Sequence, residues 1–91
     1  MGKPKSQRHE NAFRTMTPAH IREPRETDYV EVAFLESARF YRLFKRNPMY
    51  HQIMEVLRDA IAKKRAVQVR CKSFESDTLV EVQDRKLQRL G

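Results

Sequence analysis

The sequence predicts a small α+β domain with the element order ββαββ, in which one helix packs on one face of a four-stranded, mainly antiparallel sheet. Two pairs of stretches with alternating apolar and polar residues predict the strands, and a stretch with three- and four-residue spacing between the pairs predicts the helix. The chain has 91 residues, 40% of them hydrophobic, which suffices for one small domain and is too few for a multidomain enzyme.

The first strand is predicted over residues 29–34. Val30, Val32 and Phe34 fall on one side of this stretch, a pattern typical of a strand with one buried face. Residues 35–37 form a short loop, so the first two strands are expected to be antiparallel neighbours.

The second strand is predicted over residues 38–44, which are rich in aromatic side chains. We expect Phe40 and Phe44 to face the helix. This choice turns Arg42 inward, so either Arg42 sits at the rim of the sheet or the strand has the opposite orientation. With Phe40 and Phe44 inward, the other surface carries Arg39, Tyr41, Leu43 and Lys45.

The helix is predicted over residues 48–64. Asn47 can accept a hydrogen bond from a free amide of the first turn, and Pro48 suits the first helical position because it has no N–H to satisfy. The apolar stripe is wide: part of it can meet a second copy of the chain, or all of it can lie across the sheet. Its residues are Tyr50, Ile53, Met54, Leu57 and Ile61, with Met49, Val56 and Ala60 beside them.

The third and fourth strands are predicted over residues 66–72 and 78–83. In the third, Val67, Val69 and Cys71 alternate with polar residues and are expected to face inward. In the fourth, the expected inward residues are Val80 and Val82.

The ends of the chain show no strand or helix periodicity. Residues 1–28 contain three of the four prolines and are expected to form a disordered basic arm. Residues 84–91 are expected to form a flexible tail, which leaves the domain at residues 29–83. A core of this size is near the lower limit for a fold without metal or disulfides, so dimerisation is a second expectation.

The charge balance favours an acidic partner. The chain has 19 Lys and Arg against 12 Asp and Glu, a net charge of +7, and cations placed near phosphates release condensed counterions. No apolar run is long enough to predict a membrane-spanning helix. The single cysteine cannot form an internal disulfide, which is typical of proteins in a reducing compartment, so we expect a cytoplasmic protein.

The sequence contains no group of residues with the spacing of a catalytic, metal-binding or cofactor-binding site. The three histidines have no metal-ligand spacing with cysteines or carboxylates, and the two glycines lie at positions 2 and 91, away from any strand-to-helix turn. We therefore expect no enzyme activity, no metal and no cofactor. Cys71 lies between two cations that could lower the pKa of its thiol, but its place in an apolar series favours core packing.

The combination of basic and aromatic residues on strands is the main functional signal. An open sheet surface that carries tyrosine rings among cations can stack bases and neutralise backbone phosphates, which predicts nucleic-acid binding. The alternatives are an ordinary solvated surface and a protein-binding or homodimeric adaptor surface. The predicted nucleic-acid-binding residues are Arg39, Tyr41, Lys45, Arg70 and Lys72.

Overall fold

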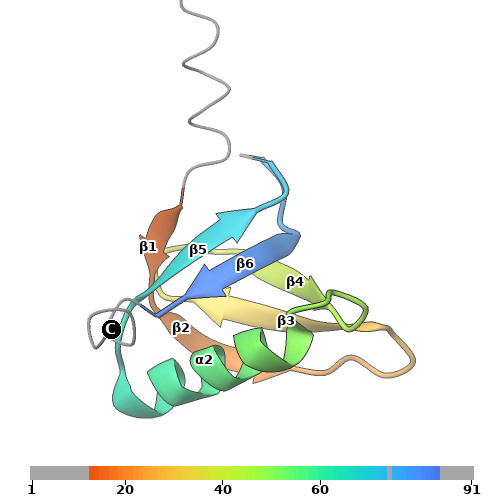
Figure 1. The fold of residues 1–91 in the computed structure, drawn as a ribbon, viewed down its shortest axis with the longest axis horizontal. Coiled ribbons are helices and arrows are strands. Elements are labelled where there is room, and N and C mark those ends of the chain that lie inside the picture. Colours follow the sequence, from red (N-terminus) through yellow and green to blue (C-terminus); the bar gives the residue numbers. More distant parts are fainter. Residues whose placement is uncertain (1–12, 74, 85–91) are drawn as a thin grey trace, which may run out of the picture.

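The computed structural model describes residues 13–73 and 75–84, and Figure 1 shows its fold. Its elements are β1 (Arg14–Met16), β2 (Pro18–Arg22), β3 (Tyr29–Phe34), β4 (Phe40–Phe44), α2 (Tyr50–Lys63), β5 (Val67–Cys71) and β6 (Leu79–Gln83). The predicted α+β class is confirmed. The single four-stranded sheet is wrong, because the strands form two three-stranded antiparallel sheets with the orders β1-β5-β6 and β2-β3-β4.

The expected disordered arm contains the two strands that change the sheet topology. β1 pairs with β5, and β2 pairs with β3, so this one segment adds a third strand to each predicted hairpin. Thr17 lies between them, where the chain passes from one sheet to the other. Residues 13–28 therefore belong to the folded domain, and residues 1–12 of the predicted arm lie outside the described residues.

The loop after β3 holds the crossing point. The carboxylate of Glu36 accepts hydrogen bonds from the backbone N–H of Thr17 at 2.7 Å and from its hydroxyl at 2.8 Å. The N–H of Leu35 donates to the carbonyl oxygen of Thr17 at 2.9 Å. The backbone hydrogen bond from Thr17 is the main cause that lowers the pKa of Glu36. These three hydrogen bonds join Thr17 to the turn after β3.

The predicted orientation of β4 is wrong. In the antiparallel register, Val30 lies opposite Leu43 and Val32 lies opposite Tyr41, so these four side chains share the inner face. Tyr41 is 2% exposed and Leu43 is fully buried. Arg42 is exposed on the other face, where its charge stays in water, and this avoids the cost of burying a guanidinium.

The second hairpin confirms the inward series Val67, Val69 and Cys71. In β6 the structure buries Leu79 and Val82, while Val80, which was expected inside, is half-buried. An irregularity in the pairing of β5 with β6 at Arg70 and Cys71 shifts the alternation by one residue.

One core lies between the two sheets and the helix. The sheets meet at a parallel bridge between Arg42 and Thr78, and α2 packs against β2 of one sheet and β6 of the other. In Figure 1 the helix runs along one side of both sheets. Its buried residues are Ile53, Met54, Leu57 and Ala60, as the helical spacing predicts; the expected stripe residue Ile61 is only half-buried.

The helix begins two residues later than predicted and ends one residue earlier. The expected cap is wrong: the helix begins at Tyr50 instead of Pro48, its N-cap residue is Met49, and no side chain caps it. The side-chain oxygen of Asn47 instead accepts the N–H of Met49 at 2.7 Å, in the turn before the helix. At the other end Lys64 adopts a left-handed conformation with φ 54°, and Arg65 then binds Asp59 at 2.6 Å and the buried carboxylate of Asp84. This network ties the end of the helix to the end of β6. Within the described ranges, no helix is long and apolar enough to cross a membrane.

Candidate functional site

The sheet β2-β3-β4 has a solvent-facing side that gathers aromatic and basic residues. Because β3 and β4 alternate, every second residue of each strand points away from the core. The register places Tyr29 opposite Phe44 and Glu31 opposite Arg42. We call this surface the outer face: it comprises Arg22 of β2, Tyr29, Glu31 and Ala33 of β3, Phe40, Arg42 and Phe44 of β4, and Arg46 just beyond β4.

Three aromatic rings on the outer face are half-buried. Tyr29, Phe40 and Phe44 lie outside the hydrophobic core and the residues packed against it. The rings of Tyr29 and Phe44 meet edge to face, with their centroids 5.4 Å apart. The outer face therefore presents apolar ring surface to solvent.

Each of these rings has an arginine over it. The guanidinium carbon lies 4.3 Å from the ring centroid for Arg22 and Phe40, and 4.8 Å for Arg46 and Phe44. The guanidinium carbon of Arg42 lies 5.2 Å from the ring centroid of Tyr29. These distances lie within the range of attractive cation–π contacts.

Two carboxylates balance part of this charge. Glu31 forms an ion pair with Arg22 at 2.7 Å, and Asp28 forms one with Arg46 at 2.9 Å. Among the residues that the structure describes, Arg42 has no carboxylate partner. Arg42 is exposed and lies opposite Glu31 in the register, but Glu31 is paired with Arg22, so Arg42 is less compensated than Arg22 and Arg46.

Of the predicted site residues, Tyr41 is placed wrongly for base stacking, because its ring belongs to the core. Its hydroxyl donates to Ser37 Oγ at 3.3 Å, and the guanidinium carbon of Arg39 lies 5.1 Å from its ring centroid. Arg39 itself is exposed. Arg39 and Tyr41 thus lie together, but beside a separate cavity on the core side of β4.

The other three predicted residues do not form one patch. Lys45 is exposed directly after β4, next to the outer face. Arg70 belongs to the other sheet, where it forms an ion pair with Glu81 at 2.9 Å. Lys72 lines a cleft of about 440 Å³ at the seam between β4 and β6, together with Phe44 and Arg46.

The sequence reasoning missed Arg22, Phe40, Arg42, Phe44 and Arg46 as site residues. The signal that could have found the β4 members was Arg42, which the assumed orientation turned toward the core. Choosing the orientation that keeps Arg42 in water brings Phe40 and Phe44 to the surface with it.

Metal binding has no support in the described part of the chain, where no group of three His, Cys, Asp or Glu side chains is placed to hold an ion.

Comparisons with known proteins identify a fold and no family. No protein-family model matches the sequence, and no curated protein matches it either. Two solved structures resemble it, both with a TM-score of 0.69: pro-protein-glutaminase, at 24% sequence identity, and a mutant of pro-protein-glutaminase, at 23%. Each match covers 82% of this chain and 25% of the solved chain, so this chain spans about a quarter of their length. The resemblance to these two structures is one of fold alone.

Proposed function

We propose that this protein binds single-stranded nucleic acid on its outer face. The observation that carries the proposal is the set of three half-buried rings on adjacent strands, each with an arginine over it. Bases stack on aromatic rings and on guanidinium planes, and a single strand leaves its bases available for this. The same arginines are close enough to the stacked bases to meet the phosphates that join them.

Arg42 is the residue best placed to contact a phosphate. It is exposed and forms no ion pair among the described residues, because Glu31, opposite it in the register, is paired with Arg22. The exposed Lys45 and the cleft-lining Lys72 extend the positive charge beyond Phe44 toward the seam with β6. Arg70, which is paired with Glu81 on the other sheet, has at most a long-range role in this proposal.

A protein partner on the same surface is the second candidate. Aromatic residues and arginine are enriched at the centres of protein interfaces. In pro-protein-glutaminase the matched fold is a quarter of a longer chain, so there it accompanies further polypeptide. The partner would be another protein or a second copy of this chain.

Fluorescence anisotropy with labelled single-stranded and duplex oligonucleotides separates the two candidates. We expect tighter binding to the single strand, and a loss of about 1–3 kcal/mol for each stacked base when Phe40 or Phe44 is changed to Ala. Phe13→Ala is the matched control, because Phe13 is an exposed phenylalanine that also has an arginine, Arg70, near its ring but lies beside the other sheet. Equal losses for all three variants would contradict stacking on the outer face.

Absence of oligonucleotide binding at low salt would reject the nucleic-acid proposal outright. Sedimentation equilibrium then tests the alternative: a concentration-dependent dimer that Phe40→Ala and Phe44→Ala abolish would place a second copy on the outer face.

A further inference from the structure

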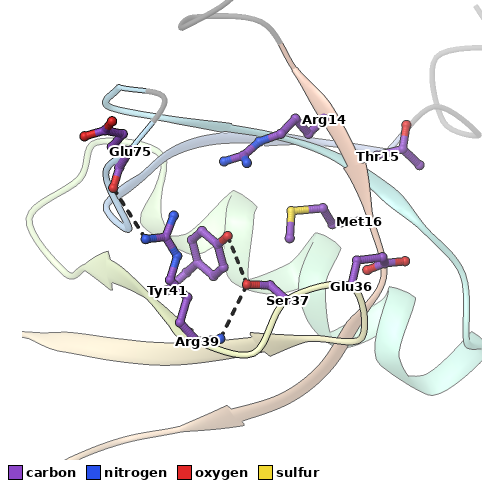
Figure 2. Close-up of a pocket in the computed structure, with 8 residues that line it drawn as sticks. All are labelled: Arg14, Thr15, Met16, Glu36, Ser37, Arg39, Tyr41 and Glu75. Atoms are coloured by element: carbon purple, nitrogen blue, oxygen red, sulfur yellow. Dashed lines mark hydrogen bonds between the residues drawn. The ribbon is translucent and has the colours of Figure 1, made fainter.

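A second cavity lies away from the outer face, on the core side of β4. It has a volume of about 710 Å³ and opens between β1, the loop after β3 and residue 75 of the loop before β6. Cavities of this size accommodate small organic ligands. The residues around it, shown in Figure 2, are Arg14, Thr15, Met16, Glu36, Ser37, Arg39, Tyr41 and Glu75.

Two guanidinium groups from distant parts of the sequence lie at this cavity. Arg14 comes from β1, and one of its nitrogens lies 3.8 Å from the sulfur of the buried Cys71. Arg39 comes from the turn before β4, and its Nη1 donates to the carbonyl oxygen of Glu75 in a long hydrogen bond of 3.5 Å. Figure 2 shows both side chains extending toward the ring of Tyr41.

Ser37 adds a hydroxyl donor. Its oxygen accepts the hydroxyl of Tyr41 at 3.3 Å and the backbone N–H of Arg39 at 3.4 Å, so both of its lone pairs are used. Because a hydroxyl rotates about its C–O bond, Ser37 can donate either to Tyr41 Oη, 3.3 Å away, or to a ligand in the cavity.

The two carboxylates of the lining, Glu36 and Glu75, keep their negative charge but are turned away from the two guanidinium groups. Glu36 has both oxygens engaged by Thr17. In Figure 2 the carboxylate of Glu75 points away from Tyr41, while the carbonyl oxygen of Glu75 faces Arg39. The guanidinium groups thus lie at the inner end of the cavity beside Tyr41, while the carboxylates lie at its rim and the charge of Asp77 also acts on Arg39.

The positive charges of Arg14 and Arg39 also affect the pKa of Tyr41. Burial acts to raise this pKa, but the hydrogen bonds with Ser37 and Arg39 and the charges of Arg39 and Arg14 outweigh burial, and the pKa is lowered. For Cys71 burial prevails and the thiol pKa is raised, although Arg14 and Arg39 both act to lower it. Two groups on different strands therefore respond to the same two arginines.

We infer that this cavity binds a phosphate monoester, held by the guanidinium groups of Arg14 and Arg39 and by the hydroxyl of Ser37. Guanidinium groups recognise oxyanions through paired N–H donors, and a monoester offers three terminal oxygens to the donors that converge here, where a carboxylate offers two. The rest of the cavity leaves room for the organic part of the ligand. The site is distinct from the outer face and does not depend on the proposed function.

Titration of the ¹⁵N-labelled full chain with inorganic phosphate and with adenosine monophosphate, followed by NMR, tests the site. We expect saturable shifts at Ser37, Arg39 and Tyr41, tighter binding of the nucleotide, and a loss of about tenfold or more in affinity for Arg39→Ala and Ser37→Ala. Arg58→Ala is the control, because Arg58 is an exposed arginine on the helix. Thermal melting confirms that each variant is folded.

Three outcomes would overturn the inference: no saturable shift at tens of millimolar phosphate, equal competition by acetate, or unchanged affinity in folded Arg39→Ala. Oligonucleotides with and without a 5′-phosphate distinguish the source of the monoester. A preference for the phosphorylated strand that Arg39→Ala removes identifies a strand end, and no preference identifies a small molecule. Loss of phosphate binding with unchanged binding to the outer face separates this site from the proposed function.

Discussion

Arg22 of β2 reaches across β3 to Phe40 of β4. Its guanidinium carbon lies 4.3 Å from the ring centroid of Phe40, and on the way its Nη2 forms an ion pair with Glu31 of β3 at 2.7 Å. One side chain thus joins all three strands of the sheet on the outer face. Because exposed ion pairs contribute little to stability, these contacts can be exchanged for contacts to a ligand at small cost.

Changing Arg22 to Ala should therefore affect binding more than folding. We expect the free energy of unfolding to change by no more than about 1 kcal/mol, because the strand ladders remain. Oligonucleotide affinity should fall, and the slope of log affinity against log salt should decrease by about 0.7 for each phosphate of a single strand that the variant no longer neutralises. Urea denaturation and anisotropy at several salt concentrations measure the two effects. A large loss of stability with an unchanged salt slope would assign Arg22 a structural role.

Phe40 and Tyr41 are neighbours in the chain but differ in burial, and this predicts effects of different size on stability. Tyr41→Ala should cost about 3–5 kcal/mol, because it empties a core position. Phe40→Ala should cost about 1 kcal/mol or less, because its ring is half-exposed and lies outside the core. Urea denaturation of the two variants gives the comparison. If Phe40→Ala were the more damaging change, the orientation of β4 would be the reverse of that described.

Acid should destabilise the fold through three carboxylates. Hydrogen bonds lower the pKa of Glu36 through Thr17, of Asp59 through Arg65 and of Glu81 through Arg70. A carboxyl whose pKa is lower in the folded state contributes stability above its unfolded pKa, about 4, and loses it as the pH falls through the folded pKa. Stability should thus decrease as the pH falls below about 4.

Urea unfolding at neutral pH and at about pH 3 measures this acid loss, with Glu81→Gln as the test variant. The variant should be less stable than the wild-type chain at neutral pH and should lose less stability on acidification. An identical pH dependence in the two chains would show that the pair of Arg70 and Glu81 contributes nothing to it.

Cys71 should react slowly with thiol reagents in the folded protein. Its side chain is 3% exposed and burial raises its pKa, so little thiolate is available. Ellman's reagent should label it at a rate that follows unfolding, and labelling should become fast in denaturant. Fast labelling of the native chain would show instead that the thiol is accessible and activated.

The sequence predicted the parts of the fold that have regular periodicity. The alternation at Val30, Val32 and Phe34 and the helical spacing of Ile53 and Leu57 each reflect one buried face. These elements are found close to their predicted bounds, as are the strands that begin at Val67 and Leu79.

The segment from Arg14 to Arg22 could not be recognised in the same way. Its strands serve two sheets, change sheet at Thr17 and contain a pairing irregularity between Pro18 and His20. Apolar residues do not recur at one regular spacing in this segment, so its pairing with distant strands decides its structure. The position of this segment, and with it Arg22 on the outer face, depends on long-range contacts that local patterns do not encode.

The sequence predicted which types of residue form the candidate surface, but not which residues form it. A surface of basic and aromatic residues on the strands was expected, and one exists, but it is built on Phe40 and Phe44 instead of Tyr41. In a strand where either face carries both aromatics and arginines, the pattern alone leaves the orientation open. The pairing of Val32 with Tyr41 decides it.

An NMR titration of the ¹⁵N-labelled chain with a short single-stranded oligonucleotide tests the proposed function most directly. We expect the largest shifts at Tyr29, Phe40, Arg42 and Phe44, while Arg70 on the other sheet stays unchanged. Shifts centred on Arg70, or no shifts at low salt, would contradict binding of a single strand on the outer face.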